Sequence, residues 1–453
     1  MEKNPVEVLK NNSESFFLVP FYYSGRKVFE KRLGVNWKKE GSSNHWFLAK
    51  HIDAFDKGKD NERIATYFTL KEESYQQYKL PARDTDIAIT SDLIVEENRL
   101  PDQFTMRISQ IRILYFTTGF GFLIYQIDHL EDELETIVNK SFALLRALVP
   151  DRKSGKGVRF TALLPCGNES NELIESDLKL MEITNKLLDV EGNRKHIEIF
   201  PTSCKSQCYI YHRIQLGKPI EEKVLTRQLL YLRKGFHSSF SVQEKEEDHL
   251  FDFTWKQNNN QYWGGSTKGV ASLSYCIPGE NNYFIKDQYA HYVRNDYFLL
   301  YMILLHQRQV LLYYNYIAVK NQNRMKKLEK IKKELIRFRI NFAYKTVSDE
   351  ASYQRFYNGM YECLSLECLN SDIQDVIDRV TEYQDFSNEK SMNFVLALIA
   401  IFSVISAFAD AIGFADRMKE GIVFTGAHWV ALILICFIMM TAIFTIIKRI
   451  FRK

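Results

Sequence analysis

The hydrophobic pattern is strongest near the C-terminus, where two apolar runs stand close together. The first extends from Asn393 to Phe414 and the second from Ala427 to Ile447. At about 1.5 Å per residue, each run forms a helix about 30 Å long, which matches the hydrocarbon core of a bilayer. We therefore predict a hairpin of two antiparallel transmembrane helices. A buried helical hairpin of a soluble protein is the alternative.

The charges around these runs predict their orientation. The short connecting loop balances its basic residues with acidic ones, whereas the second run ends in Lys448, Arg449, Arg452 and Lys453. Positive charge favours the inner side, so the C-terminus is expected inside, and an even number of spans places the N-terminus there too. The expectation is a multi-pass protein of the inner (cell) membrane with both termini cytoplasmic.

The first run carries a polar stripe. Ser403, Ser406 and Asp410 follow one another at helical spacings of three and four. A carboxyl group within a span is costly unless it faces water or a partner, so these residues are expected to line a cation pathway. Asn393, at the start of the run, is included among the expected pore-lining residues. The alternative places Asp410 at the outer interface, solvated by headgroup water.

Upstream of the first run, the pattern predicts long helices. One helix is expected from about Asp349 to Lys390, continuing directly into the span, so that it transmits motion of the soluble region into the membrane. Its heptad seam consists of Leu369, Ile373, Val376, Val380 and Tyr383.

Two further helices are expected before this stalk. An aromatic-rich helix over 286–319 is expected to be buried in a bundle. A basic helix over 320–339 is expected to pair with the acidic stalk or to be solvated. Binding of the basic face to anionic lipid or RNA is the alternative.

The N-terminal region mixes alternating and amphipathic segments. Strands are predicted at 15–23, 64–70, 86–95, 196–200, 208–214 and 249–255, a hairpin over 110–127, and a helix over 130–148. The predicted architecture is an α+β cytoplasmic domain, a helical stalk and two C-terminal transmembrane helices. The boundaries are 1–285 for a sensor or ligand-binding domain, 286–390 for the helical bundle and stalk, and 391–453 for the pore domain.

Composition and motifs exclude several functions. The 453-residue chain has a net charge of only +4, which argues against nucleic acid as the main partner, and its seven scattered cysteines predict neither a disulfide framework nor a zinc site. The N-terminus lacks a signal-peptide pattern. No GxSxG, HExxH or P-loop pattern occurs, so neither an enzyme nor a cofactor or metal site is expected.

One glycine-rich stretch, from Tyr262 to Tyr275, is a candidate ligand loop. Its glycines expose backbone N–H groups, which suit an anion or phosphate. The side chains expected to bind are Trp263, by stacking on a base, and Ser266, Thr267 and Lys268, as donors. A glycine-rich turn between two strands is the alternative.

The order of a cytoplasmic α+β domain, a long helix entering the first of two C-terminal spans, a short loop and a basic tail resembles the CorA superfamily of divalent cation channels. The family has Gly-Met-Asn at the outer end of the first span. Here the stretch from Ala411 to Ala415 keeps only Gly413. This departure argues against a housekeeping magnesium transporter.

With its enlarged N-terminal domain, the chain also looks like the CorA-like membrane effectors of type III CRISPR systems. That resemblance implies an antiviral homo-oligomer, expected to be a pentamer, in which a nucleotide second messenger opens a channel for cations, divalent ones included. The messenger would be a cyclic oligoadenylate or an adenylated S-adenosylmethionine. The alternatives are a membrane-anchored enzyme or binding module and a constitutive divalent metal transporter.

Overall fold

The computed structural model describes most of the chain. The described residues are 6–41, 45–53, 64–78, 80–83, 85–91, 102–130, 133–148, 158–165, 173–177, 180–202, 208–241, 254–321, 324–419, 429 and 433. They belong to two compact units, Met1–Ile373 and Gln374–Lys453. Apart from Trp429 and Ile433, the second predicted span lies outside the described residues, as do the loop before it and the basic tail.

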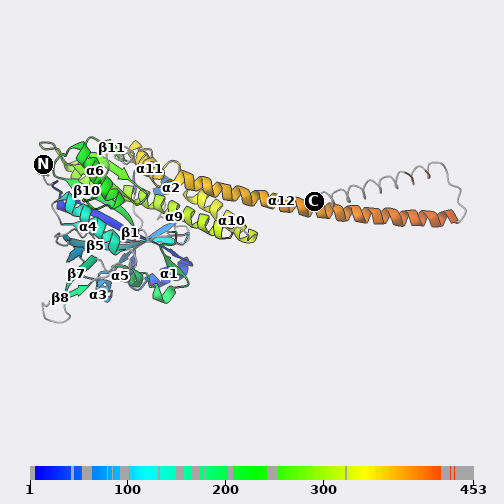
Figure 1. The fold of residues 1–453 in the computed structure, drawn as a ribbon, viewed down its shortest axis with the longest axis horizontal. Helices are drawn as coiled ribbons and strands as arrows, with labels where there is room; N and C mark the ends of the chain where they lie inside the picture. The colour runs from blue at the N-terminus through cyan, green and yellow to red at the C-terminus, as the bar shows by residue number, and fades with distance from the viewer. Residues whose placement is uncertain are drawn as a thin grey trace. The chain divides into compact units, whose positions relative to one another are not determined.

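The first unit is built on one mixed sheet, to which thirteen strands belong among the described residues. They are β1 (Glu14–Tyr23), β2 (Trp37–Lys39), β3 (Ala65–Leu70), β4 (Asp86–Ser91), β5 (Asp102–Phe116), β6 (Phe120–His129), β7 (Val158–Pro165), β8 (Leu173–Asp177), β9 (Ile197–Ile199), β10 (Tyr209–Leu216), β11 (Thr254–Asn258), β12 (Gln261–Gly265) and β13 (Gly269–Tyr275). The order is β11-β12-β13-β10-β1-β6-β5-β4-β7-β8 (Figure 1). Strands β10 and β13 are parallel, whereas β1 is antiparallel to both of its central neighbours.

Helices of the same unit cover this sheet and continue beyond it. They are α1 (Arg26–Leu33), α2 (Lys50–Asp53), α3 (Glu72–Gln77), α4 (Leu134–Ala147), α5 (Leu180–Leu187), α6 (Glu222–Lys234), the π-helical η3 (Phe284–Tyr289), α8 (Ala290–Tyr292), the π-helical η4 (Val293–Tyr297), α9 (Phe298–Lys320), α10 (Met325–Phe342), α11 (Ala351–Cys363) and α12 (Leu366–Lys419). The last helix extends into the second unit.

The alternation of side chains along the central strands creates two cores. On one face, α4 and α6 pack against β10 and β13 through residues such as Val138, Leu229 and Leu273. On the other face, α9 lies against β1, β5 and β6. Three ring pairs mark this contact, with centroids 4.7 Å apart for Phe16–Phe298, 3.8 Å for Phe116–His306 and 5.0 Å for Tyr22–Tyr313. The aromatic-rich segment is therefore buried, as its pattern predicts.

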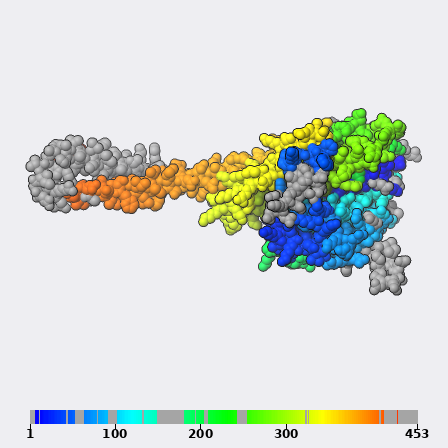
Figure 2. Space-filling model, turned by 180° about the vertical axis from the view of Figure 1, so that it is seen from behind, coloured from blue at the N-terminus to red at the C-terminus, as the bar shows by residue number. Residues whose placement is uncertain are grey.

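An early segment of the chain lies against the late helices. The backbone N–H of Ala49 donates to Val347, and the Ser348 hydroxyl donates to the carbonyl of Phe47. Figure 2 shows blue N-terminal residues against the yellow helical residues on this face. Segments about 300 positions apart in the sequence are therefore joined here.

Most predicted elements are confirmed, including the α+β sheet domain followed by long C-terminal helices. The hairpin over 110–127 is β5 and β6, joined at Thr117–Gly119, where Gly119 has φ of 92°. The candidate ligand loop is itself a hairpin: β12 and β13 joined by a short turn.

The prediction of one uninterrupted helix from 349 to 390 is wrong. Two helices, α11 and α12, meet at Leu364–Ser365, where Ser365 has φ of 53°. This left-handed residue closes α11, because its N–H donates to Glu362 while that of Leu364 donates to Met360. Arg308 of α9 also donates to the carbonyl of Leu364.

Beyond this break, α12 continues without interruption to Lys419, so the predicted continuity of stalk and span is confirmed. Within Leu366–Gly413, an 18-residue window has a mean hydropathy of 2.4 and none of it is buried. By length and composition this helix can cross a membrane. Of the predicted seam, Ile373 and Val380 are buried, whereas Tyr383 is 50% exposed. Ile377, which is not a member of the predicted seam, is also buried.

Candidate functional site

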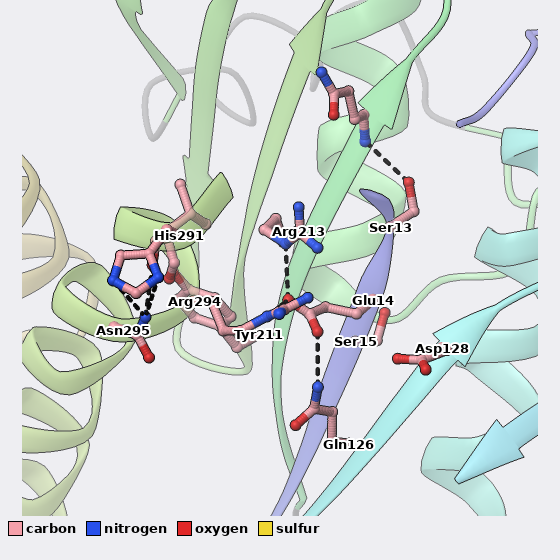
Figure 3. A network of polar contacts seen from close by, with 12 residues as sticks. Ser13, Glu14, Ser15, Gln126, Asp128, Tyr211, Arg213, His291, Arg294 and Asn295 are labelled. Carbon is pink, nitrogen blue, oxygen red and sulfur yellow. Dashed lines mark hydrogen bonds and ion pairs between the residues drawn. The ribbon is translucent and has the colours of Figure 1, made fainter. Parts of the chain in front are cut away.

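The centre of the sheet holds a buried carboxylate. Glu14 of β1 is 1% exposed, and its Oε1 accepts from Nε of Arg213 on β10 and from Nε of Arg294 in η4, each at 2.7 Å. The side-chain amide of Gln126 on β6 donates to Oε2 at 2.8 Å. Figure 3 shows both guanidinium groups converging on the carboxylate. Four segments of the chain are therefore joined at one side chain.

Glu14 is ionised in this setting. Burial by itself raises the pKa of its carboxyl, but the charges and hydrogen bonds of Arg213 and Arg294 outweigh that effect and lower the pKa below its ordinary value. A charge removed from water is tolerated only when it is paired and hydrogen-bonded in this way. The network holds the π-helical segment η4 against the sheet.

Further contacts fix η4 on both sides. The Tyr211 hydroxyl on β10 donates to the carbonyl of Val293 at 2.5 Å. On the other side of η4, Asp296 accepts from the Tyr353 hydroxyl of α11 at 3.2 Å and lies 2.6 Å from Nδ1 of His45. The rings of Tyr297 and Tyr353 stack with centroids 4.5 Å apart. Since π-helical turns are often found at functional sites, η4 is a candidate for a segment that moves.

The opposite face of β1 carries a second polar cluster. The Ser15 hydroxyl lies 2.6 Å from Nε2 of His129 and 2.5 Å from Nδ1 of His212. All three side chains are fully buried. Burial lowers the pKa of both imidazoles, that of His212 to about 3, so both are neutral at pH 7. Substrate cannot reach the enclosed Ser15 hydroxyl, and the cluster serves to satisfy polar groups inside the core.

The residues predicted for the ligand loop lie in the β12–β13 hairpin, but in different environments. Trp263 is fully buried, with ring contacts to Trp255, Tyr297 and Phe356 that occupy the indole inside the core. The Ser266 hydroxyl donates to the carbonyl of Arg233 at 2.6 Å and accepts the backbone N–H groups of Lys268 and Gly269. Stacking of Trp263 on a base and donation by Ser266 to a ligand stay predictions. Thr267 lies at the half-buried tip of the turn.

Lys268, by contrast, is exposed and lies close to other cations. Its pKa is lowered by partial burial and by the charges of Arg146 and Lys234. Its ammonium is 5.9 Å from the centroid of the Phe236 ring. We call Arg146, Lys234 and Lys268 the cationic cluster. The pKa of Lys268 is thus lowered first by desolvation and then by the two neighbouring positive charges, and a bound anion would offset the repulsion among these charges.

The same hairpin touches the end of α11. A Cβ added to Gly265 would lie 2.6 Å from Sγ of Cys363 and 2.7 Å from Sδ of Met360. Only glycine permits so close an approach. Cys363 is the last residue of α11, directly before the break at Ser365. The hairpin that carries Lys268 therefore contacts the C-terminal end of α11, the helix that precedes α12 in the chain.

The predicted pore-lining residues lie on α12. Ser403, Ser406 and Asp410 are all exposed, and Ser403 Oγ donates to the carbonyl of Ile399 at 2.8 Å. At about 100° per residue the three point in nearly the same direction, whereas Asn393 is offset from Ser403 by about 80°. The structure thus groups the first three on one stripe and places Asn393 beside it.

Comparison with known proteins gives no relative: no family model, curated protein or solved structure matches this chain. In the part of the chain that the structure describes, no group of three His, Cys, Asp or Glu side chains is placed to hold a metal ion.

Sequence reasoning missed Glu14, Arg213 and Arg294. A signal was present, because Glu14 and Arg213 are single charges within otherwise apolar strand segments. A charge in such a position requires a buried partner. The identity of the partners depends on strand pairing and could not be read from the sequence.

We predict that Glu14→Gln lowers the free energy of unfolding by about 3 kcal/mol, because Arg213 remains buried without a counter-charge. Urea unfolding of the detergent-solubilised protein measures this. The matched control is Asp86→Asn, which breaks an exposed pair with Arg107 and should cost at most about 1 kcal/mol. Equal losses for the two variants would contradict the central role of Glu14.

A pH dependence follows from His212. Its pKa is about 3 in the folded protein and near 6.5 when unfolded, so below pH 6.5 only the unfolded chain takes up the proton. Stability is full above pH 6.5 and is lost as the pH falls towards 3, by about 2 kcal/mol at pH 5. We expect His212→Gln to reduce the loss of unfolding free energy between pH 7 and pH 5 by about 2 kcal/mol, while the buried His129 still contributes its own share. Substitution of the exposed His196 by Gln is the control and should leave the change in unfolding free energy between pH 7 and pH 5 as in the wild type. A wild-type change in His212→Gln would contradict the contribution assigned to His212.

Proposed function

We propose that the chain forms a homo-oligomeric, ligand-gated cation channel of the cell membrane, built from two spans per subunit with both termini inside. The observation that carries the proposal is α12, one helix that begins in the soluble unit and includes the exposed apolar window with Ser403, Ser406 and Asp410 on one stripe. A helix used only as an anchor needs no such stripe. Asp410 side chains of several subunits would form a ring that attracts cations and repels anions.

Gating is proposed to begin at the cationic cluster. An anionic ligand bound by Lys268, Lys234 and Arg146 would shift the β12–β13 hairpin, whose Gly265 is in van der Waals contact with the end of α11. Packed elements respond to such shifts by changing between discrete arrangements. The break at Ser365 then lets α12 move relative to α11, and its continuity carries that motion into the membrane.

The ligand class proposed is a nucleotide second messenger, because its phosphates match the charge of the cluster. The resemblance to the CorA-like effectors of type III CRISPR systems gives the candidates, cyclic oligoadenylates and adenylated S-adenosylmethionine. It also gives the expected setting, which is antiviral defence by a pentamer. The absence of most of the Gly-Met-Asn motif favours this gated role over constitutive magnesium transport.

The second candidate is a membrane-anchored binding module in which the spans are only a tether. The compactness of residues Met1–Ile373 as a unit favours it. This candidate predicts ligand binding without any ion flux.

The test is ion flux through the purified protein in liposomes, with and without each nucleotide messenger. We expect flux only with a messenger, and a higher half-maximal concentration of that messenger in Lys268→Ala and Lys234→Ala. Lys218→Ala, at an exposed site in a different turn, is the control and should respond as the wild type does. Flux without ligand would indicate a constitutive transporter, and none under any condition would favour the anchored module.

A second prediction concerns Asp410. Asp410→Asn should reduce the ratio of cation to anion permeability, read from the reversal potential under a salt gradient, while Asp410→Glu should retain it. Removal of the charge from the ring eliminates its attraction for cations. Subunit assembly of both variants should match the wild type. An unchanged reversal potential in Asp410→Asn would place this side chain outside the pore.

A further inference from the structure

Two helices each carry a stripe of like charge on their exposed side. On α10, the basic stripe consists of Lys326, Lys330, Lys333 and Arg337. On α12, before the membrane run, the acidic stripe consists of Asp375, Asp378, Glu382, Asp385 and Glu389. All nine side chains are exposed within their own chain. Successive members are three or four residues apart, so each set follows one side of its helix.

Each stripe points away from the side by which its helix packs. The buried residues of α10 are Leu328, Ile331, Leu335, Phe338 and Phe342, and those of α12 include Ile373, Ile377 and Val380. At about 100° per residue, the basic and acidic stripes each lie roughly 150° around the helix from these buried residues. A helix that packs through its apolar side holds the opposite side outward.

The stripes match one another in extent and charge. The basic stripe runs over about 16 Å and the acidic stripe over about 21 Å, at about 1.5 Å per residue. They carry four positive and five negative charges. Ile340, which is 77% exposed, continues the basic stripe, and Phe386, which is 55% exposed, lies beside the acidic one. An apolar contact is thus available next to the charges, as complementary interfaces commonly have.

We propose that the basic stripe of α10 docks on the acidic stripe of α12 of a second copy of this chain. This inference rests on the homo-oligomer proposed above and names the surface that builds it. The contact joins two different surfaces, so it is heterologous, and its repetition closes a ring. An anionic membrane surface would satisfy only the basic stripe, whereas a second copy satisfies both.

The test uses charge reversal in the full-length chain, with subunit number measured by light scattering or native mass spectrometry in detergent. The double substitution Lys326→Glu/Lys333→Glu reverses two charges of the basic stripe on α10. The double substitution Glu382→Lys/Asp385→Lys reverses two charges of the acidic stripe on α12. Either variant alone brings like charges together and should shift the oligomer to monomers at an unchanged thermal midpoint. The control Lys327→Glu/Lys345→Glu makes the same charge change at exposed positions off the stripe and should remain oligomeric.

Co-expression of the two reversed chains, each with its own tag, decides between contacts within and between copies. Each reversed stripe then finds a complementary stripe only on the other chain. Because only unlike chains attract, the two must alternate, so we expect them to copurify in complexes with an even number of subunits. Assembly should weaken as salt rises from about 0.1 to about 1 M and the Debye length falls from about 10 to about 3 Å.

Three outcomes would overturn the inference. One is a wild-type oligomer from either reversed chain. Another is that the two reversed chains fail to copurify, whereas a single chain that carries all four reversals assembles. This result would mean that the two stripes pair within one copy of the chain. The third is an α10 variant that stays oligomeric but no longer binds phosphatidylserine vesicles, which would assign the stripe to lipid. None of these readouts uses ion flux. An oligomer that assembles through the two stripes but conducts no ions would therefore contradict the proposed channel function and not the proposed contact between copies.

Discussion

The structure of the first unit, Met1–Ile373, depends on the pairing of one buried carboxylate with two guanidinium groups. Glu14 lies on the central strand of the sheet, where an uncompensated charge would destabilise the core by several kcal/mol. Arg213 reaches it from the neighbouring strand and Arg294 from the helical layer. The requirement to neutralise this charge therefore fixes strand pairing and helix docking together.

The helical layer is held by this pairing at η4, and η4 contacts α11 through Asp296 and Tyr297. The β12–β13 hairpin meets α11 independently, at Cys363. Two routes from the sheet thus converge on one short helix, which ends at the left-handed Ser365. The position of α11 is therefore determined by contacts with both η4 and the β12–β13 hairpin.

The sequence predicts the elements better than their partners. The apolar runs in 15–23, in 110–127 and after Asn393 are sufficient to predict these elements, because the length and local pattern of an apolar run distinguish a short buried strand from a long helix. The helix break at Ser365 contains no glycine or proline from which it could be predicted. The hydrogen bonds that cap α11 and the bond from Arg308 to the carbonyl of Leu364 stabilise it. Lys268 was predicted as a ligand residue from composition, but its proximity to Arg146 of α4 and Lys234 of α6 arises from the packing of these helices beside the β12–β13 hairpin.

The long separation between Glu14 and Arg294, 280 positions, also has a consequence for biosynthesis. The buried carboxylate acquires its last partner only when residue 294 has left the ribosome, about a hundred residues before the first apolar run. At roughly 5 to 20 residues per second, this leaves on the order of 5 to 20 seconds. The first unit can thus close its charged core before the apolar run of α12 is synthesised.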